Sequence, residues 1–263
     1  MKKLQFFIVI ILAVCIAIIA NYYIKETSAE SYYSKASEAF INNDYEKAIE
    51  YFSKVIEKEP NKPEAYWARG KCYDKIKNFP ATISDFTKAL EIDQNYFNAY
   101  LSRGQTYSNA KKYQEALADY SKAAEINPYN YETFFFRGTT YSTLKDYDQA
   151  IKDYSKAIEL EPSLTANYMI RGYTYQYIKD CTLAINDFSK VIELNSNYSD
   201  AYYARGYIYY SQSDYDKAIS DLNKVIELSP THKKAFIVRG DIYNILGNTT
   251  KAQTDYQSAA ELE

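Results

Sequence analysis

The sequence of 263 residues predicts an all-α protein, with one hydrophobic helix at the N-terminus followed by a row of helical hairpins. Three observations predict this class. An unbroken apolar run occupies residues 6–20, and Lys2 and Lys3 precede it. Six of the 7 glycines then recur every 34 residues, from Gly70 to Gly240. Aromatic residues, which make up 17% of the chain and include 31 tyrosines, recur in the same phase.

Composition excludes several classes of function. With 47% hydrophobic and 25% charged residues, the chain can bury a substantial core and is not a disordered tail. A net charge of −3 offers no basic field for a phosphate backbone, so we expect no nucleic-acid partner. One histidine and three widely separated cysteines exclude a zinc ribbon and a disulfide scaffold.

Residues 1–28 form the first predicted element, a membrane-targeting segment. Residues 4–24 approach the roughly 20 apolar residues that a spanning helix needs, while the apolar run also reaches the length of a signal-peptide core. We expect an uncleaved, single-pass anchor in the cell membrane, with the two lysines holding the N-terminus in the cytoplasm and the remaining chain outside. Cleavage near Ser28, which would release a secreted protein, stays open because length alone does not decide.

Residues 29–263 form a second, repetitive domain. Gly70, Gly104, Gly138, Gly172, Gly206 and Gly240 mark six units, and Ala36 holds the same phase one period earlier. The seven predicted repeats span residues 29–62, 63–96, 97–130, 131–164, 165–198, 199–232 and 233–263. Positions are numbered below from this glycine, so that position −4 is four residues before it.

Each repeat predicts two antiparallel helices, or about fourteen in all. Positions −4, 0 and +3 form one stripe of a first helix, and positions +9, +12, +13, +16, +19 and +20 line one face of a second. Six residues stand where the second helix needs an N-cap, and Lys112 breaks the rule: Asp44, Asn78, Asp146, Asp180, Asp214 and Asn248. Hairpins of this kind must cover one another, because one alone leaves its apolar face in water.

A glycine inside a helix costs about 1 kcal/mol relative to alanine, so its recurrence needs a reason. We expect the second helix of each hairpin to approach the glycine closely, with the bulky ring at position −4 filling the adjoining space. Gly247 lies outside the period and is predicted in a turn.

The repeated residues resemble those of the tetratricopeptide repeat (TPR) family over residues 29–263. The resemblance rests on an aromatic residue at −4, glycine at 0, tyrosine at +3, alanine at +12, a large side chain at +16 and a small one at +19, as in Tyr100, Gly104, Tyr107, Ala116, Tyr120 and Ala123. It implies a right-handed α-solenoid, or superhelix, whose first helices line a concave groove. In this family the groove holds an extended peptide or a partner's helix.

The groove candidates follow from helix geometry. Positions −3, +1, +4 and +5 lie about 120° around the first helix from the packing stripe. The candidate binding residues are Trp67, Phe135, Met169, Tyr173, Tyr177, Tyr203, Tyr207 and Tyr210. We expect the last five of these, all tyrosines, to form a cluster, since aromatic residues with a polar tip suit a partly wet binding surface. No basic residue stands at position −3, which argues against the carboxylate clamp used by chaperone-binding relatives.

The remaining polar residues favour structure over catalysis. An arginine at −1 and an aspartate at +15 recur in six repeats, and we interpret them as structural ion pairs between the two helices of a hairpin. We expect His232 to be a surface residue, and Cys72 and Cys181 to be small hydrophobic side chains. The sequence contains no phosphate loop, dinucleotide fingerprint or nucleophile elbow, so we predict no enzyme, no cofactor and no metal site.

The sequence therefore predicts a membrane-anchored scaffold that binds a protein or peptide in its groove, within an assembly of the cell envelope. Two alternatives remain open. The tyrosine cluster would also suit a glycan-binding module, in which sugars stack on the rings. A soluble adaptor would result from cleavage of the N-terminal segment.

Overall fold

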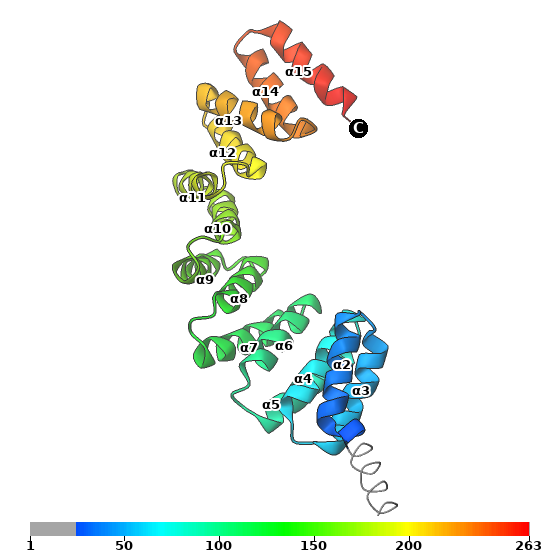
Figure 1. The fold of residues 1–263 in the computed structure, drawn as a ribbon. Helices are drawn as coiled ribbons and strands as arrows, with labels where there is room; N and C mark the ends of the chain where they lie inside the picture. The colour runs from blue at the N-terminus through cyan, green and yellow to red at the C-terminus, as the bar shows by residue number, and fades with distance from the viewer. Residues whose placement is uncertain (1–24, 263) are drawn as a thin grey trace, which may run out of the picture. The chain divides into compact units, whose positions relative to one another are not determined.

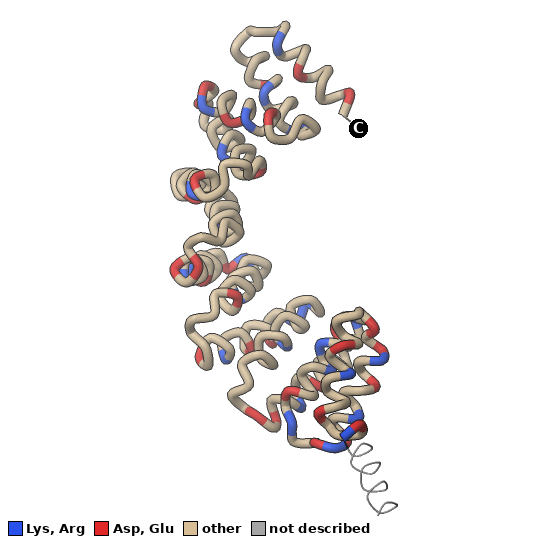
Figure 2. Tube along the Cα trace, in the orientation of Figure 1, with Lys and Arg blue, Asp and Glu red and all other residues tan. Residues whose placement is uncertain are grey.

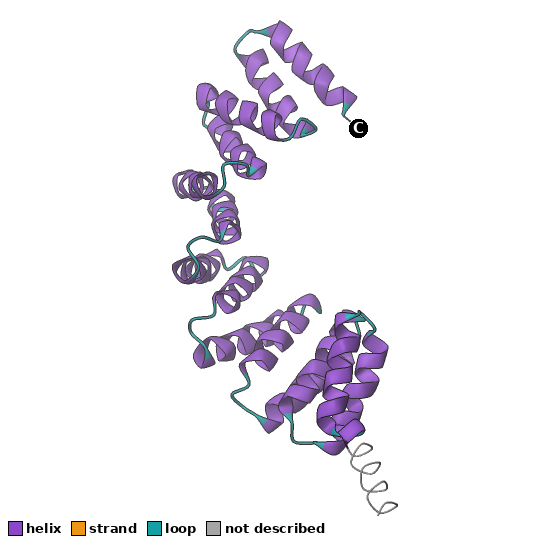
Figure 3. Cartoon of the chain, viewed as in Figure 1, coloured by secondary structure: helices purple, strands orange, loops and turns teal. Residues whose placement is uncertain are grey.

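The computed structural model describes residues 25–262, which form fourteen α-helices and no β-strand (Figure 1 and Figure 3). They divide into two compact units, and the boundary along the chain falls between Pro128 and Tyr129. Unit 1 contains α2 (Ala29–Ile41), α3 (Tyr45–Lys58), α4 (Pro63–Lys75), α5 (Phe79–Ile92), α6 (Phe97–Asn109) and α7 (Tyr113–Ile126). Unit 2 contains α8 (Tyr131–Thr143), α9 (Tyr147–Leu160), α10 (Thr165–Tyr177), α11 (Cys181–Leu194), α12 (Ser199–Ser211), α13 (Tyr215–Leu228), α14 (Lys233–Ile245) and α15 (Thr249–Glu261).

Every predicted repeat is one helical hairpin, so the predicted number of helices in this part of the chain is confirmed. Within each unit, the first helix of a hairpin packs mainly against its own second helix, and the second helix packs against the next hairpin. The helices of unit 1 carry lysine, arginine, aspartate and glutamate interspersed along their lengths (Figure 2). The right-handed superhelix stays a prediction.

The N-terminal hydrophobic helix and the membrane segment of residues 4–24 lie outside the described residues. In the part of the chain that the structure describes, no helix combines the length and the apolar character needed to cross a membrane.

The second helices begin at the predicted caps. The six predicted residues each accept a hydrogen bond from the backbone N–H three residues further on, as Asp146 does from Gln149 at 3.3 Å. Lys112 makes no side-chain cap bond at the start of α7, as predicted. These bonds satisfy one of the backbone donors that the first helical turn leaves without a partner.

The turn within the hairpin was predicted at Gly247 alone, and the structure shows the same turn in every repeat. Position +7 adopts a left-handed backbone in all seven repeats, with φ between 59° and 78°, at Asn43, Lys77, Lys111, Lys145, Lys179, Ser213 and Gly247. Only one of these is glycine, the residue that tolerates this conformation most readily. The left-handed residue ends the first helix and turns the chain toward the cap of the second.

The repeated glycines lie against the second helix of their own hairpin, as expected, but a different ring fills the space. A β-carbon added at Gly70 would stand 2.6 Å from Cε1 of Phe86, and one added at Gly138 would stand 2.9 Å from Cε1 of Tyr154. Both rings occupy position +16, not the predicted position −4. Gly206 differs because Leu222 replaces the ring, and there the closest atom is the β-carbon of Asp221 at 3.0 Å.

Candidate functional site

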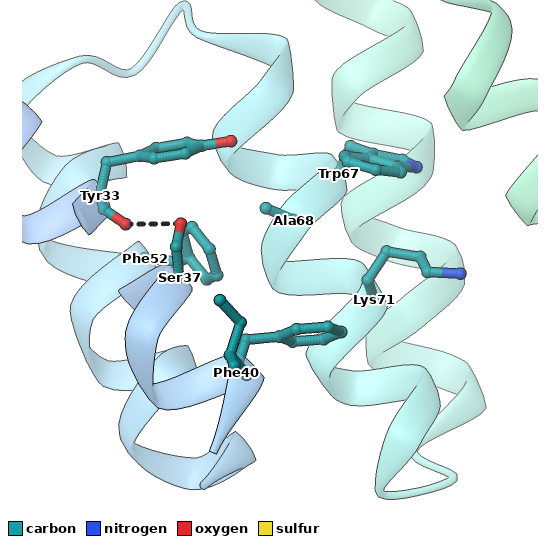
Figure 4. A pocket seen from close by; sticks show the side chains of 8 residues that line it. Tyr33, Ser37, Phe40, Phe52, Trp67, Ala68 and Lys71 are labelled. Atoms are coloured by element: carbon teal, nitrogen blue, oxygen red, sulfur yellow. Dashed lines mark hydrogen bonds between the residues drawn. The ribbon is translucent and has the colours of Figure 1, made fainter. Parts of the chain in front are cut away.

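The predicted groove positions line a cavity in unit 1, between α2 and α4. Its volume is about 260 Å³. Tyr33 and Trp67 occupy position −3, Ser37 and Lys71 position +1, and Phe40 and Ile41 positions +4 and +5; Phe52 and Ala68 complete the wall (Figure 4). Positions chosen from the helical period therefore meet around one space.

The walls of this Trp67 cavity are mainly apolar and aromatic. The rings of Tyr33 and Phe40 extend from α2 toward α4 (Figure 4). The Ser37 hydroxyl donates a hydrogen bond to the Tyr33 carbonyl at 2.9 Å, so its polarity is satisfied within α2. The Lys71 ammonium group points away from the cavity (Figure 4) and makes no ion pair within the described residues.

The indole of Trp67 is held in place by unit 1 itself. Its Nε1 donates a hydrogen bond to the Ser102 hydroxyl of α6 at 3.1 Å, and its ring packs edge to face on Tyr96 with 6.2 Å between centroids. A ring fixed on both sides loses little conformational entropy when a ligand arrives.

Phe135 lines a separate cavity of about 220 Å³ in unit 2, formed by the N-terminal turns of α8 and α10. Tyr131, Phe136 and Leu164 contribute apolar wall, and Asn167 contributes an amide. Asn167 is fully buried, and its Oδ1 and Nδ2 have no hydrogen-bond partner among the described residues.

The structure brings together only part of the predicted tyrosine cluster. Tyr203 and Tyr207 lie 6.2 Å apart between ring centroids, and Tyr207 and Tyr210 lie 6.1 Å apart. Tyr173 packs on Phe188, and burial, with a smaller electrostatic contribution from Tyr203, raises the pKa of its phenol. We refer to Tyr173, Tyr203, Tyr207 and Tyr210 as the tyrosine ladder.

Tyr177 belongs to a different contact. Its ring lies 4.8 Å from that of Tyr147 in the preceding hairpin, and the hydrogen bond between the two side chains raises the pKa of Tyr147. Its position at +5, at the end of α10, brings it beside the preceding second helix and not beside α12. Sequence spacing within one helix does not carry that information.

Met169 is a correction to the predicted site. Its side chain is 7% exposed and lies in a core cluster with Tyr168, Ala184 and Phe188, so it offers no surface to a partner. Leu101, at the same position of another repeat, is also buried. Position −3 lies between the groove and the hairpin core: the aliphatic side chains of Met169 and Leu101 are buried there, whereas the larger rings of Trp67 and Phe135 stay half-buried.

The repeated arginines and aspartates form structural ion pairs, as predicted. Arg171 donates from Nε and Nη2 to both carboxylate oxygens of Asp187, at 2.9 and 2.7 Å. Burial lowers the pKa of Arg171, but the hydrogen bond and the charge of Asp187 together outweigh it, so that the pKa is raised. The aspartates are buried, which raises the pKa of Asp119 although Arg103 opposes the shift.

These pairs have a third member that the sequence interpretation missed. Nη1 of Arg171 donates to the Ser155 hydroxyl at 2.8 Å, and Ser155 lies on the second helix of the preceding hairpin. The same bond joins Arg69 to Ser53, Arg103 to Thr87, Arg205 to Ser189 and Arg239 to Asn223. The signal was present, because position +17 is Ser, Thr, Asn or Gln in every repeat. We call each set an arginine clamp.

His232 is more than the surface residue that we expected. It is half-buried and caps α14, where its Nδ1 accepts a hydrogen bond from the Ala235 N–H at 3.2 Å. Its ring lies 4.7 Å from the ring of Tyr203, at one end of the tyrosine ladder.

The Cys72 thiol is buried in unit 1. Burial raises the pKa of the Cys72 thiol to about 12, which keeps it protonated and unreactive. Among residues 25–262, no three His, Cys, Asp or Glu side chains gather where they could hold a metal ion.

Comparison with protein families shows where the chain matches. A family model described as tetratricopeptide repeat matches residues 29–62, 97–130, 131–164 and 199–232. A second model with the same description matches residues 63–96 and 234–263. Among curated proteins, none matches this chain as a relative.

Solved structures with the same fold are numerous. MamA is 29% identical and covers 64% of this chain and 91% of its own, with a TM-score of 0.60. YrrB, described as a TPR protein with an unusual peptide-binding site, is 26% identical and covers 70% of this chain and 95% of its own, with a TM-score of 0.62. The C-terminal part of a repeat protein from Cytophaga hutchinsonii, 22% identical, covers 88% of this chain and 95% of its own, with a TM-score of 0.79, and shows the fold alone.

Proposed function

Because this chain belongs to the tetratricopeptide repeat family, whose fold is a protein-interaction module, we propose that it is a scaffold that binds a partner peptide on its first helices. We propose further that residues 4–24 anchor it in the cell membrane and that the repeats serve an assembly of the cell envelope. The role is binding and not catalysis.

The Trp67 cavity is the observation that carries the peptide-binding proposal. It is apolar, it opens among the predicted groove positions, and it has room for a bulky side chain. Complete burial of one large apolar side chain contributes about 1.5–3 kcal/mol, and a wall already ordered by Ser102 and Tyr96 limits the entropic cost. The likeness to YrrB supports a peptide ligand.

Ile41 and Ile245 provide a matched pair of variants. Both occupy position +5 at the end of a first helix and both are exposed, at 77% and 54%. Only Ile41 lines the Trp67 cavity. A charged side chain at either place leaves the core unchanged, so it tests binding without unfolding the protein.

The experiment selects, from a library of displayed random peptides, those that bind the full chain. We expect the selected peptides to carry an aromatic or large aliphatic residue, and Ile41→Asp to weaken their binding about tenfold, since a charge would face the buried side chain. Ile245→Asp should leave the affinity unchanged. A selection without enriched peptides, or equal weakening by both variants, would contradict the proposal.

A further inference from the structure

The tyrosine ladder is an aromatic surface formed by α10 and α12 in unit 2. Tyr173 and Tyr207 are 45% and 43% exposed, and Tyr203 and Tyr210 are half-buried between them and the next hairpin. The ring contacts run from Tyr203 to Tyr207 and on to Tyr210, with centroids about 6 Å apart at each step. The ring of His232 contacts Tyr203 at one end of the ladder.

Many tyrosines elsewhere in the repeats have a cationic neighbour, whereas none stands over the ladder rings within the described residues. Arginine guanidinium groups lie within 6 Å of rings at positions −4 and +3, as Arg171 does with Tyr168 and Tyr175. Lysines cover other rings in the same way, as Lys217 covers Tyr209. Across residues 25–262, no lysine or arginine stands over any of the four ladder rings, so a cation from outside can reach the exposed parts of Tyr173 and Tyr207.

Two carboxylates add negative charge beside the ladder. Asp200 is exposed and acts on Tyr173, where it adds to the effect of burial in raising the pKa of the phenol. Asp241 acts on Tyr210 in the same direction and accepts a hydrogen bond from the Tyr256 hydroxyl at 2.8 Å. Neither carboxylate forms an ion pair with a side chain of the described region.

We propose that the tyrosine ladder binds an extended basic segment of a partner protein, with arginine or lysine side chains over the rings and Asp200 and Asp241 as their counter-charges. The inference rests on the proposed peptide-binding function and names the chemistry of the partner at a second surface. A cation over an exposed ring gains about 0.5–1 kcal/mol, so several such contacts along the ladder are needed for useful affinity. A neutral glycan could donate hydroxyl hydrogen bonds to the two carboxylates but would not compensate their charge.

The test uses the full chain and a fluorescein-labelled peptide of alternating arginine and serine, measured by fluorescence anisotropy. Two comparison peptides replace arginine by citrulline, which keeps the shape without the charge, or by glutamate. We expect the arginine peptide to bind about tenfold more tightly than the citrulline peptide, and the glutamate peptide not to bind.

Variants locate the binding on the ladder. We expect Tyr207→Leu and Asp241→Asn each to weaken the arginine peptide about fivefold, because one removes a ring face and the other a counter-charge. Asparagine still accepts the bond from Tyr256, and circular dichroism checks that both variants are folded. The matched controls are Tyr129→Leu and Asp148→Asn, whose side chains are exposed and outside the ladder, and they should have no effect.

Equal binding of the citrulline peptide, equal weakening by the controls, or competition by a neutral oligosaccharide in place of the arginine peptide would overturn the inference. None of these outcomes bears on the Trp67 cavity, which lies in unit 1 and is tested through Ile41. Failure of the display selection would instead count against the proposed function.

Discussion

Asn167 shows how one residue can set the local stability of a repeat. It occupies position −5, where four other repeats carry a fully buried alanine: Ala65, Ala99, Ala201 and Ala235. Its amide gives up its contacts with water on folding and gains no partner among the described residues. Such a loss costs about 1–3 kcal/mol.

We therefore expect Asn167→Ala to stabilise the protein by about 1 kcal/mol, since the amide penalty is larger than the cost of the small space left behind. The measurement is the free energy of unfolding in urea. Thr133→Ala, at the same position of α8, is the control and should destabilise by about 1 kcal/mol, because the Thr133 hydroxyl donates to Asn130 at 2.8 Å. Loss of stability in Asn167→Ala would mean that the amide is satisfied.

The left-handed residues make a related point. A non-glycine residue in this conformation costs about 1 kcal/mol, yet four lysines adopt it at position +7. Sequence patterns did not predict it, because lysine is a good helix former and gives no turn signal. Asn43 and Gly247 at the same position were the available signal.

At the scale of the helices, the arginine clamp is the main polar contact. Each clamp joins three helices, because the guanidinium group bonds the aspartate of its own hairpin and a polar side chain of the hairpin before it. In the clamp of Arg171, 18% of the arginine side chain and 6% of the aspartate side chain are exposed. Removal of one partner from such a buried pair leaves a charge without compensation.

We expect Asp187→Asn to destabilise unit 2 by about 3 kcal/mol, and the coupling energy of Arg171 and Asp187 in a double-mutant cycle to be about 1–3 kcal/mol. Chemical denaturation measures both. Glu193→Gln on the same helix removes an exposed pair with Lys190 and should change stability by less than about 0.5 kcal/mol. A coupling energy near zero would rule out the structural role of the pair.

The sequence predicts the helices and their repeated contacts better than it predicts the candidate site. Hairpins, caps and ion pairs follow from a fixed period, because the same residue types recur at the same helical angle. The candidate site follows less well. Met169 and Tyr177 share positions with exposed groove residues. Met169 is nevertheless buried in a core cluster, and Tyr177 contacts Tyr147, because side chains from neighbouring helices decide both outcomes. A single-helix projection contains neither.

For the whole molecule, the proposed anchor makes a separate prediction. If residues 4–24 span the membrane, the full chain should stay in the membrane fraction after alkaline carbonate washing, and its N-terminal sequence should begin at Met1. Val14→Arg places a charge in the middle of the apolar run, at a cost of about 2.5–3.5 kcal/mol, and should release part of the protein. A soluble chain that begins near residue 29 would show that the segment is a cleaved signal.

The geometry of the clamps also bears on how such a chain changes length. In unit 2, Arg171, Arg205 and Arg239 each reach sixteen residues forward to an aspartate and sixteen residues back to a serine or asparagine. If one whole repeat is deleted or duplicated, each arginine next to the new junction therefore still has an aspartate ahead of it and a polar side chain behind it as acceptors. Growth by copying, one hairpin at a time, needs no compensating substitution in this network.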